Sequence, residues 1–508
     1  MKSKRLLVIS ILLIAMLACS TSLPRSEKTP TYLPSDPEAL DIMDYTFEDS
    51  TLFADDLQPD LRGLIQDFPL TDIYHLDVSL EDDLLSVSGK LEVRYYNRLD
   101  TDLTEVYFRL LPNLWGSLMQ VNNVTVNGKP VTPRLESEDT ALYVSLDEIV
   151  PGSGHVDIGM NFEAIIPQDD SSNYGTFAYL DGTLALAQFY PIIPLRDESG
   201  WRTEIYPSRG DVTVTESAHY LVKISAPEDV LLAASGVRIA YQNEGDRQVI
   251  TQVAALAREF YLAGSVNYQV QTLSEDNVSF AIYSRPEVGS SAYKSLEQMA
   301  EAVSIFTRHY GEYPYRELEI VATPTSAGGV EYPGIIAINQ TFYVPGETPG
   351  DRGSDIMVES VVVHEVAHQW FYNIVGDDQG REPWLDEAMA QYLTYQYFND
   401  RYGSIVGKNY IEFWRDRWQR VELEPIPIGL PVEAYSDLEY GAIVYGRGPL
   451  FLKALSDKMG EAEFGQFLKD YFTTYSWKVA TGENFQALAE TTCSCDLDLL
   501  FEEWVTIE

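Results

Sequence analysis

Hydrophobic and polar residues alternate along residues 72–271 in a pattern that predicts β-strands. In Leu85–Tyr96 and Tyr220–Ser225, apolar side chains recur at every second position, as expected when one face of a strand is buried. Turn-forming sequences such as Asn127-Gly128 and Gly152-Ser-Gly154 separate these segments. Many short strands at this spacing predict a large antiparallel β saddle or sandwich.

Near residue 290 the spacing of the apolar residues changes to three and four, which predicts helices. We therefore expect an α+β, multidomain protein, with an N-terminal β domain over 56–285 and a mainly helical domain over 286–508. The expected helices of the second domain are Ser295–His309, Trp384–Asp400, Gly407–Arg420, Pro449–Lys458 and Asn484–Glu490.

The N-terminus predicts export. Basic residues in Met1–Arg5 precede an apolar run that is too short to span a bilayer, so residues 1–18 read as a signal peptide. Met16-Leu-Ala-Cys19 resembles a bacterial lipobox, in which the cysteine is lipidated, and plain secretion is the alternative. Residues 19–55 begin with a run rich in Pro and Ser and predict a flexible tether. We expect an exported lipoprotein anchored to a membrane at the cell surface.

The overall charge excludes some partners. The formal net charge is −43 and the pI is about 4.3, which opposes binding to nucleic acid or to anionic lipid. No obligate protein partner is evident. Besides Cys19, only Cys493 and Cys495 remain, too few for a disulfide scaffold. A bridge across one residue would be strained, so we expect a local feature of a turn, and the redox state of the pair stays open.

The segment His364-Glu365-x-x-His368 predicts a metal-binding helix. Positions four apart lie one above the other on a helix, so the two imidazoles can share one ion while Glu365 lies beside it. The alternative is a buried helix with two incidental histidines. Only six histidines occur in 508 residues, which disfavours chance placement around a glutamate.

Glu387 is the predicted third ligand, nineteen positions after His368 at the start of the next helix. Asp386 competes for this role but points elsewhere on that helix. Two histidines and one glutamate leave a position open for water, which predicts one catalytic Zn²⁺ per chain. Glu365 would then act as the general base that takes the proton of this water.

With these residues, the chain resembles the alanyl aminopeptidase and leukotriene hydrolase group of zinc peptidases (gluzincins). Gly328-Gly-Val-Glu-Tyr332 is similar to the family's Gly-x-Met-Glu-Asn motif, and Tyr440-x-x-x-Val-Tyr445-Gly-Arg-Gly448 resembles its Tyr-x-Lys-Gly segment, with Arg447 in place of Lys. The resemblance implies a thermolysin-like catalytic domain and a zinc aminopeptidase that acts on peptides.

The resemblance also implies a role for several residues. Glu331 would pair with the free α-ammonium of the substrate, and Gly328 and Gly329 would let the peptide approach closely. Tyr445 would donate its hydroxyl to the oxyanion of the tetrahedral intermediate, and Tyr440 would belong to the substrate site.

Two departures from the family pattern leave alternatives open. In Ala187-Gln188-Phe-Tyr190, Gln188 can line the first side-chain pocket, but Tyr190 stands where the family has a second amine-binding glutamate. A zinc endopeptidase with weak N-terminal selectivity is therefore an alternative, and a catalytically silent surface binding protein is a third. The sequence ends where relatives continue into further domains, so we expect an open cleft that admits longer peptides.

Overall fold

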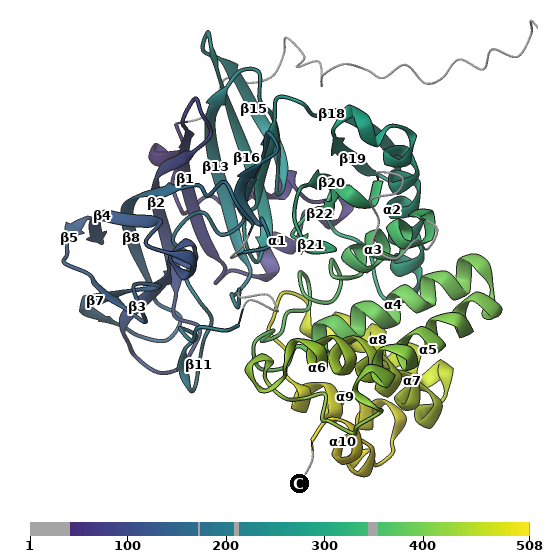
Figure 1. Ribbon diagram of the computed structural model, residues 1–508. Helices are drawn as coiled ribbons and strands as arrows, with labels where there is room; N and C mark the ends of the chain where they lie inside the picture. Colours follow the sequence, from purple (N-terminus) through teal and green to yellow (C-terminus); the bar gives the residue numbers. More distant parts are fainter. Residues whose placement is uncertain (1–40, 171–172, 208–212, 344–353, 507–508) are drawn as a thin grey trace, which may run out of the picture.

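The computed structural model describes residues 41–170, 173–207, 213–343 and 354–506. A β-rich lobe precedes a mainly helical lobe, and a smaller sheet lies where they meet (Figure 1). This arrangement is the predicted α+β architecture.

The largest sheet has eight strands and forms the centre of the β lobe (Figure 1). Its neighbouring strands are antiparallel, as predicted, except for one parallel pair, β1 with β13. Alternating burial along β8 (His155–Ile165) agrees with the alternation in the sequence, whereas nearly every residue of β16 (Arg247–Ala257) is buried. In spatial order the strands are β15 (Val237–Asn243), β16 (Arg247–Ala257), β13 (Ala218–Pro227), β1 (Asp72–Leu80), β2 (Ser86–Tyr96), β8 (His155–Ile165), β4 (Met119–Val126) and β5 (Lys129–Pro130).

Three smaller sheets complete the β lobe, and apolar side chains from the large sheet and from these sheets form one core cluster. The first sheet contains β3 (Leu103–Arg109), β7 (Ala141–Val150) and β6 (Arg134–Glu136). The second contains β14 (Leu231–Ala234), β17 (Leu262–Ser265), β10 (Thr183–Leu186) and β9 (Phe177–Leu180), and the third pairs β11 (Arg196–Asp197) with β12 (Gly200–Trp201).

A five-stranded sheet crosses the predicted domain boundary at residue 285. Its strands, in spatial order, are β18 (Gln269–Glu275), β19 (Val278–Ser284), β20 (Glu317–Thr323), β22 (Ile335–Asn339) and β21 (Gly329–Tyr332). β19 pairs in parallel with β20, so β18 and β19 belong to the second lobe rather than to the N-terminal domain. The strand β21 lies at the edge of this sheet, where it borders the site described below.

Helices form most of the second lobe, and their core is continuous with the five-stranded sheet. The predicted helices are present with somewhat longer or shifted bounds. The α-helices are α1 (Leu64–Asp67), α2 (Ser290–His309), α3 (Ser354–Ala367), α4 (Trp384–Tyr402), α5 (Ser404–Trp418), α6 (Asp437–Ala442), α7 (Gly448–Met459), α8 (Glu461–Tyr475), α9 (Gly482–Cys493) and α10 (Asp498–Trp504). A π-helical turn, η9 (Ile443–Arg447), joins α6 to α7.

The predicted tether does not extend to residue 55. Ile42 and Phe53 are buried in the core cluster that the large sheet shares with the second lobe. The 3₁₀ turn η1 (Ile42–Asp44) contacts β1 and β13, and η2 (Thr51–Asp55) contacts β13 and β16. These apolar residues stabilise a docked segment, whereas Cys19 and the predicted signal peptide lie outside the described residues.

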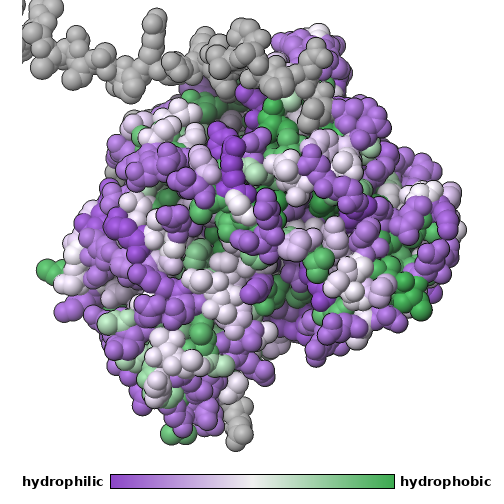
Figure 2. Space-filling view, turned by 180° about the vertical axis from the view of Figure 1, so that it is seen from behind, coloured by the Kyte–Doolittle hydropathy of each residue, from purple (hydrophilic) through white to green (hydrophobic). Residues whose placement is uncertain are grey.

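Cys493 and Cys495 form a disulfide at the end of α9, with Cα atoms 5.2 Å apart, which settles the redox state that the sequence left open. Within the described ranges, no helix is long and apolar enough to cross a bilayer. Hydrophilic residues cover most of the face shown in Figure 2, as expected from the strongly acidic composition.

Candidate active site

The structure brings the three predicted metal ligands together. The Nε2 atoms of His364 and His368 lie 3.3 Å apart, and Glu387 Oε2 lies 3.1 Å from the first and 3.6 Å from the second. His368 follows the last residue of α3, but its N–H still bonds the carbonyl of His364 at 3.3 Å, so the two rings share one face. Glu387 comes from the first turn of α4.

Polar side chains orient both histidines. Asp386 pairs with Nδ1 of His368, and Gln391 contacts Nδ1 of His364 at 3.3 Å, which leaves both Nε2 atoms directed at Glu387. A carboxylate on the far nitrogen of a histidine is the usual support for a metal ligand. Asp386, the competing ligand candidate, therefore lies behind His368 rather than beside it.

The charges of this cluster suit a divalent cation. Burial acts to raise the pKa of Glu387, but hydrogen bonds with His364 and His368 outweigh it and hold the pKa below its usual range. Burial raises the pKa of Glu331 well above its ordinary value; His368 opposes this rise, and Asp386 adds to it. In this cluster the buried carboxyl groups thus outnumber the cationic side chains. Two histidines and one glutamate form a donor set that zinc accepts.

Glu365 lies on α3 between the two histidines and faces β21. A Cβ atom added at Gly329 would come within 2.6 Å of both Cγ and Cδ of Glu365. Gly328, by contrast, has open space around its missing Cβ, with the nearest atom, a Phe342 ring carbon, 3.9 Å away. Glycine at position 329 is therefore what lets the Glu365 carboxylate occupy its place.

Glu331 is held at the edge strand β21 by groups from the loop between α3 and α4. Its backbone carbonyl accepts a hydrogen bond from Asn373 Nδ2 at 2.9 Å. Gln379 Nε2 lies 3.4 Å from Glu331 Oε1 and 2.6 Å from Asp386 Oδ2, so it joins the two carboxylates. This fixed, buried carboxylate faces the same cavity as the metal ligands.

Tyr445 reaches the metal ligands from the π-helical turn η9. Its hydroxyl donates a hydrogen bond to Glu387 Oε1, and its ring lies 6.1 Å from that of His364. A π-helical turn inserts an extra residue and often marks a functional site. Tyr440 packs its ring against Tyr445 at 5.8 Å and is not among the residues that line the cavity, so its contact with the site is indirect.

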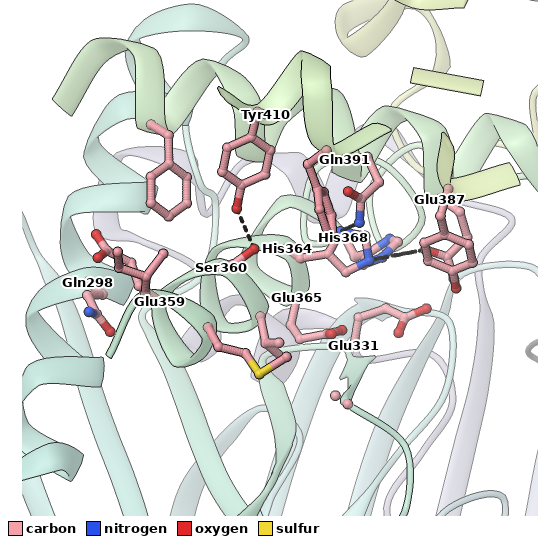
Figure 3. A pocket seen from close by; sticks show the side chains of 18 of the residues that line it. Gln298, Glu331, Glu359, Ser360, His364, Glu365, His368, Glu387, Gln391 and Tyr410 are labelled. Carbon is pink, nitrogen blue, oxygen red and sulfur yellow. Dashed lines mark hydrogen bonds and ion pairs between the residues drawn. The ribbon is translucent and has the colours of Figure 1, made fainter. Parts of the chain in front are cut away.

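A cavity of about 1250 Å³ contains the cluster and continues past it between α2, α3, α4 and α5. In Figure 3, Tyr410 points into this cavity from α5 and meets Ser360, while Glu331 lies on the other side of the two histidines. The volume exceeds the 300–1000 Å³ that typical small-molecule pockets enclose. It is therefore large enough for several residues of a peptide.

Gln188 and Tyr190 are not among the residues that line this cavity. Gln188 is buried and donates a hydrogen bond from Nε2 to Glu259 at 2.5 Å. Tyr190 is buried in the core of the β lobe against Tyr74 and Tyr220 and accepts a hydrogen bond from the backbone N–H of Phe260. Neither lines the cavity formed by the described residues.

Several residues of the site were not predicted from the sequence. Asn373, Gln379 and Gln391 position Glu331 or a histidine, and Arg417 of α5 lines the cavity beside Tyr445. Asn373 and Gln379 lie within eleven residues of His368, so proximity to the metal motif was the only available signal. Arg417 carries no such signal.

Comparison with known proteins found a matching family model and several relatives. Residues 294–504 match the Peptidase family M1 domain. The chain is 25% identical over 295 residues to Aminopeptidase 2 of Candida albicans, covering 56% of this chain and 32% of that protein. It is 22% identical over 387 residues to Aminopeptidase M1 of Arabidopsis thaliana, covering 73% of this chain and 42% of that protein. The chain thus spans less than half the length of these relatives.

Solved structures show the same fold. An M1 zinc metallopeptidase from Deinococcus radiodurans superposes with a TM-score of 0.65 at 18% identity, covering 86% of this chain and 93% of that one. A mutant of a Deinococcus radiodurans M1 zinc metallopeptidase, solved with a bound Tyr-Ser-Ala substrate, superposes with a TM-score of 0.64 over 86% of this chain and 94% of that one. The predicted fold class is therefore confirmed.

Proposed function

Because the chain carries a peptidase family M1 domain over residues 294–504, we propose that it is a zinc-dependent aminopeptidase that releases N-terminal residues from peptides. The observation that carries this proposal is the position of Glu331. It is a buried carboxylate fixed in the same cavity as His364, His368 and Glu387, where it can pair with an α-ammonium group. The relatives' names support the proposal.

His364, His368 and Glu387 would hold the zinc. When bound, zinc supplies the Lewis-acid chemistry that makes water a competent nucleophile near neutral pH. Glu365, which is not a ligand in this arrangement, takes a proton from the water and later delivers it to the leaving amine.

Two further residues would act on the peptide. Glu331 anchors its first residue, so that only the bond after this residue reaches Glu365. Tyr445, whose hydroxyl is directed at the ligand cluster, donates to the developing oxyanion.

A comparison of free and blocked peptides tests this function. The zinc-loaded protein should hydrolyse a peptide with a free N-terminus and leave its N-acetylated form intact, because acetylation removes the charge that Glu331 binds. A chelator such as 1,10-phenanthroline should abolish the reaction, and added Zn²⁺ should restore it. Equal cleavage of both peptides would replace aminopeptidase with endopeptidase activity, and full activity in chelator would refute zinc dependence.

The endopeptidase alternative rested on Tyr190 standing in place of a second amine-binding glutamate. Tyr190 lies in the β-lobe core and does not line the cavity, so this position supplies no carboxylate to the cavity and the alternative stands. Free and acetylated peptides still separate the two functions directly. A catalytically silent protein would bind zinc without cleaving either peptide.

We further propose that the protein is exported and anchored through a lipid on Cys19, on the sequence alone. The basic, apolar and Met16-Leu-Ala-Cys19 segments support this proposal. Metabolic labelling with radioactive palmitate in a bacterial host tests it. Wild-type protein should carry the label and Cys19→Ser should not; label on both proteins, or on neither, would contradict lipidation at this residue.

A further inference from the structure

Arg417 is a cation without an anionic partner in the cavity of the proposed active site. It lies one residue before the end of α5 and lines the cavity. Its Nε atom is buried with no hydrogen-bond partner, and no carboxylate among the described residues lies within ion-pair distance of it. Burial lowers the pKa of the guanidinium, while Tyr445 and Glu387 raise it.

The contacts of Arg417 show that this position is fixed. Its guanidinium carbon lies 4.7 Å from the ring centre of Phe413 and 5.3 Å from that of Tyr445. A Cβ atom added at Gly446 would come within 2.9 Å of Arg417 Cβ and 3.0 Å of the Trp414 carbonyl, so this glycine lets α5 approach η9 closely. The arginine is therefore held beside the proposed oxyanion donor by packing alone.

A positive charge without an acidic partner, as at Arg417, is unexpected in so acidic a chain. Only 35 lysines and arginines face 78 aspartates and glutamates, yet a cation in this cavity has no anion beside it. Arg401, which lines the same cavity, pairs with Glu359 at 3.6 Å and with Glu301 at 3.4 Å. A partly buried charge without a partner is unfavourable unless a ligand supplies the opposite charge.

The direction in which a peptide would bind brings its downstream part towards Arg417. Under the proposed function, the amine lies at Glu331 on β21, and the residues after the scissile bond must occupy the rest of the cavity. That part is walled by α5: Tyr410 points into it in Figure 3, and Arg417, two helical turns further along, lies on the same face of the helix.

We propose that Arg417 forms a carboxylate-binding subsite for the part of the substrate that lies downstream of the scissile bond. This inference rests on the proposed function and adds a second charged contact at the opposite end of the peptide. The planar guanidinium matches a carboxylate with two parallel hydrogen bonds. The carboxylate can be the C-terminus of a short peptide or an acidic side chain, and the two sources are separable.

Peptide pairs that differ only in this charge test the proposal. Ala-Ala, Ala-Ala-Ala and Ala-Ala-Ala-Ala are compared with their C-terminal amides, and Ala-Glu-Ala-amide with Ala-Gln-Ala-amide. In wild type, at least one acid should have a kcat/KM about 10–100-fold above its neutral partner, mainly through KM, as charged hydrogen bonds give elsewhere. The pair that shows the preference identifies the source of the carboxylate.

Variants assign the effect to Arg417. Arg417→Gln should bring the acid-to-neutral ratio close to one, and Arg417→Lys should retain part of it. Arg415→Gln, an exposed position on the same helix that pairs with Glu412, should leave the ratio unchanged. Because the readout is a ratio, a general loss of kcat from a shifted Tyr445 does not affect it.

Three outcomes overturn the proposal. These are equal cleavage of every acid and neutral pair by wild type, a ratio that survives in Arg417→Gln, and a ratio lost equally in Arg415→Gln. If Arg417→Gln does not fold, the wild-type ratios and Arg417→Lys still decide. Failure of the proposed function looks different: no peptide with a free N-terminus is cleaved, whatever its C-terminal charge.

Discussion

Two adjacent glycines, Gly328 just before β21 and Gly329 at its start, offer a sharp test of how the catalytic base is placed. In Gly329→Ala, the new Cβ would lie 2.6 Å from the Cγ and Cδ atoms of Glu365. Carbon atoms pack favourably at about 3.5 Å, so Glu365 or the strand must move by about 1 Å. In Gly328→Ala, the nearest atom is 3.9 Å away and nothing has to move.

A displacement of this size is large for catalysis. Misplacing a reacting group by about 1 Å can lower a rate by about 10²-fold, equivalent to about 2.7 kcal/mol of transition-state stabilisation. We therefore expect kcat of Gly329→Ala to fall about 100-fold. KM should change little, because the change does not touch the side chains that hold Glu331. The zinc content should remain at one per chain, because His364, His368 and Glu387 are not displaced.

The assay measures kcat and KM on Ala-p-nitroanilide, with zinc determined by atomic emission in the same preparations. Gly328→Ala is the matched control: its methyl group points into open space of the cavity, so any effect falls on KM through contact with the substrate. Wild-type kcat in a zinc-loaded Gly329→Ala protein would refute the reasoning. An equal loss of kcat in both variants would also refute it, because general damage to β21 would then be the cause.

Four other changes have defined outcomes. Glu365→Gln should lower kcat by about 10²–10⁴-fold with zinc retained; activity near wild type would remove Glu365 as the base. Tyr445→Phe should lower kcat by about 10²–10³-fold at unchanged zinc content, and an effect on KM alone would argue against oxyanion stabilisation. Glu331→Gln should reduce the preference for free over N-acetylated peptide by at least about tenfold, whereas an unchanged preference would place the amine elsewhere. Asp56, buried and bonded to the N–H of Ala255, has its pKa raised by burial to about 8. Because the protonated form is favoured in the folded state, Asp56 contributes to the free energy of unfolding. This contribution is complete below about pH 4 and is lost as the pH rises to 8. Asp56→Asn should therefore increase Tm relative to wild type more at pH 8.5 than at pH 5, and an equal change at both would contradict the shift.

The metal site could be predicted from sequence because its parts are close in the chain. His364 and His368 are one helical turn apart, so helix geometry brings them together. Glu387 lies on the next α-helix, α4, which packs against α3. The approximate helix positions followed from apolar spacing for the same reason. The periodicity of apolar residues predicts a single helix or strand and its neighbours in the sequence.

Contacts between distant segments could not be predicted in this way. Alternation identifies β18 and β19 as strands, but it does not say which sheet they join, so the domain boundary was placed on the wrong side of them. The position of Tyr190 was misjudged for a similar reason, since a family motif gives a residue's place in sequence and not the direction of its side chain. The burial of Ile42 and Phe53 likewise depends on strands elsewhere in the chain, such as β13, whose His219 stacks on Phe53.

Glu331 and Arg417 place opposite charges at two positions along the cavity. Glu331 is a buried carboxylate that needs a cation, and Arg417 is a partly buried cation that needs an anion. A short peptide carries both charges in the matching order, with its ammonium upstream and its carboxylate downstream of the bond to be cleaved. Binding such a peptide would satisfy both ends at once, so removing either charge should weaken short peptides more than long or amidated ones. Double substitution at Glu331 and Arg417 should then cost less than the sum of the two single losses in kcat/KM for a short peptide, because the second contact depends on the register set by the first. Strict additivity on peptides of every length would mean that the two ends do not hold the same molecule.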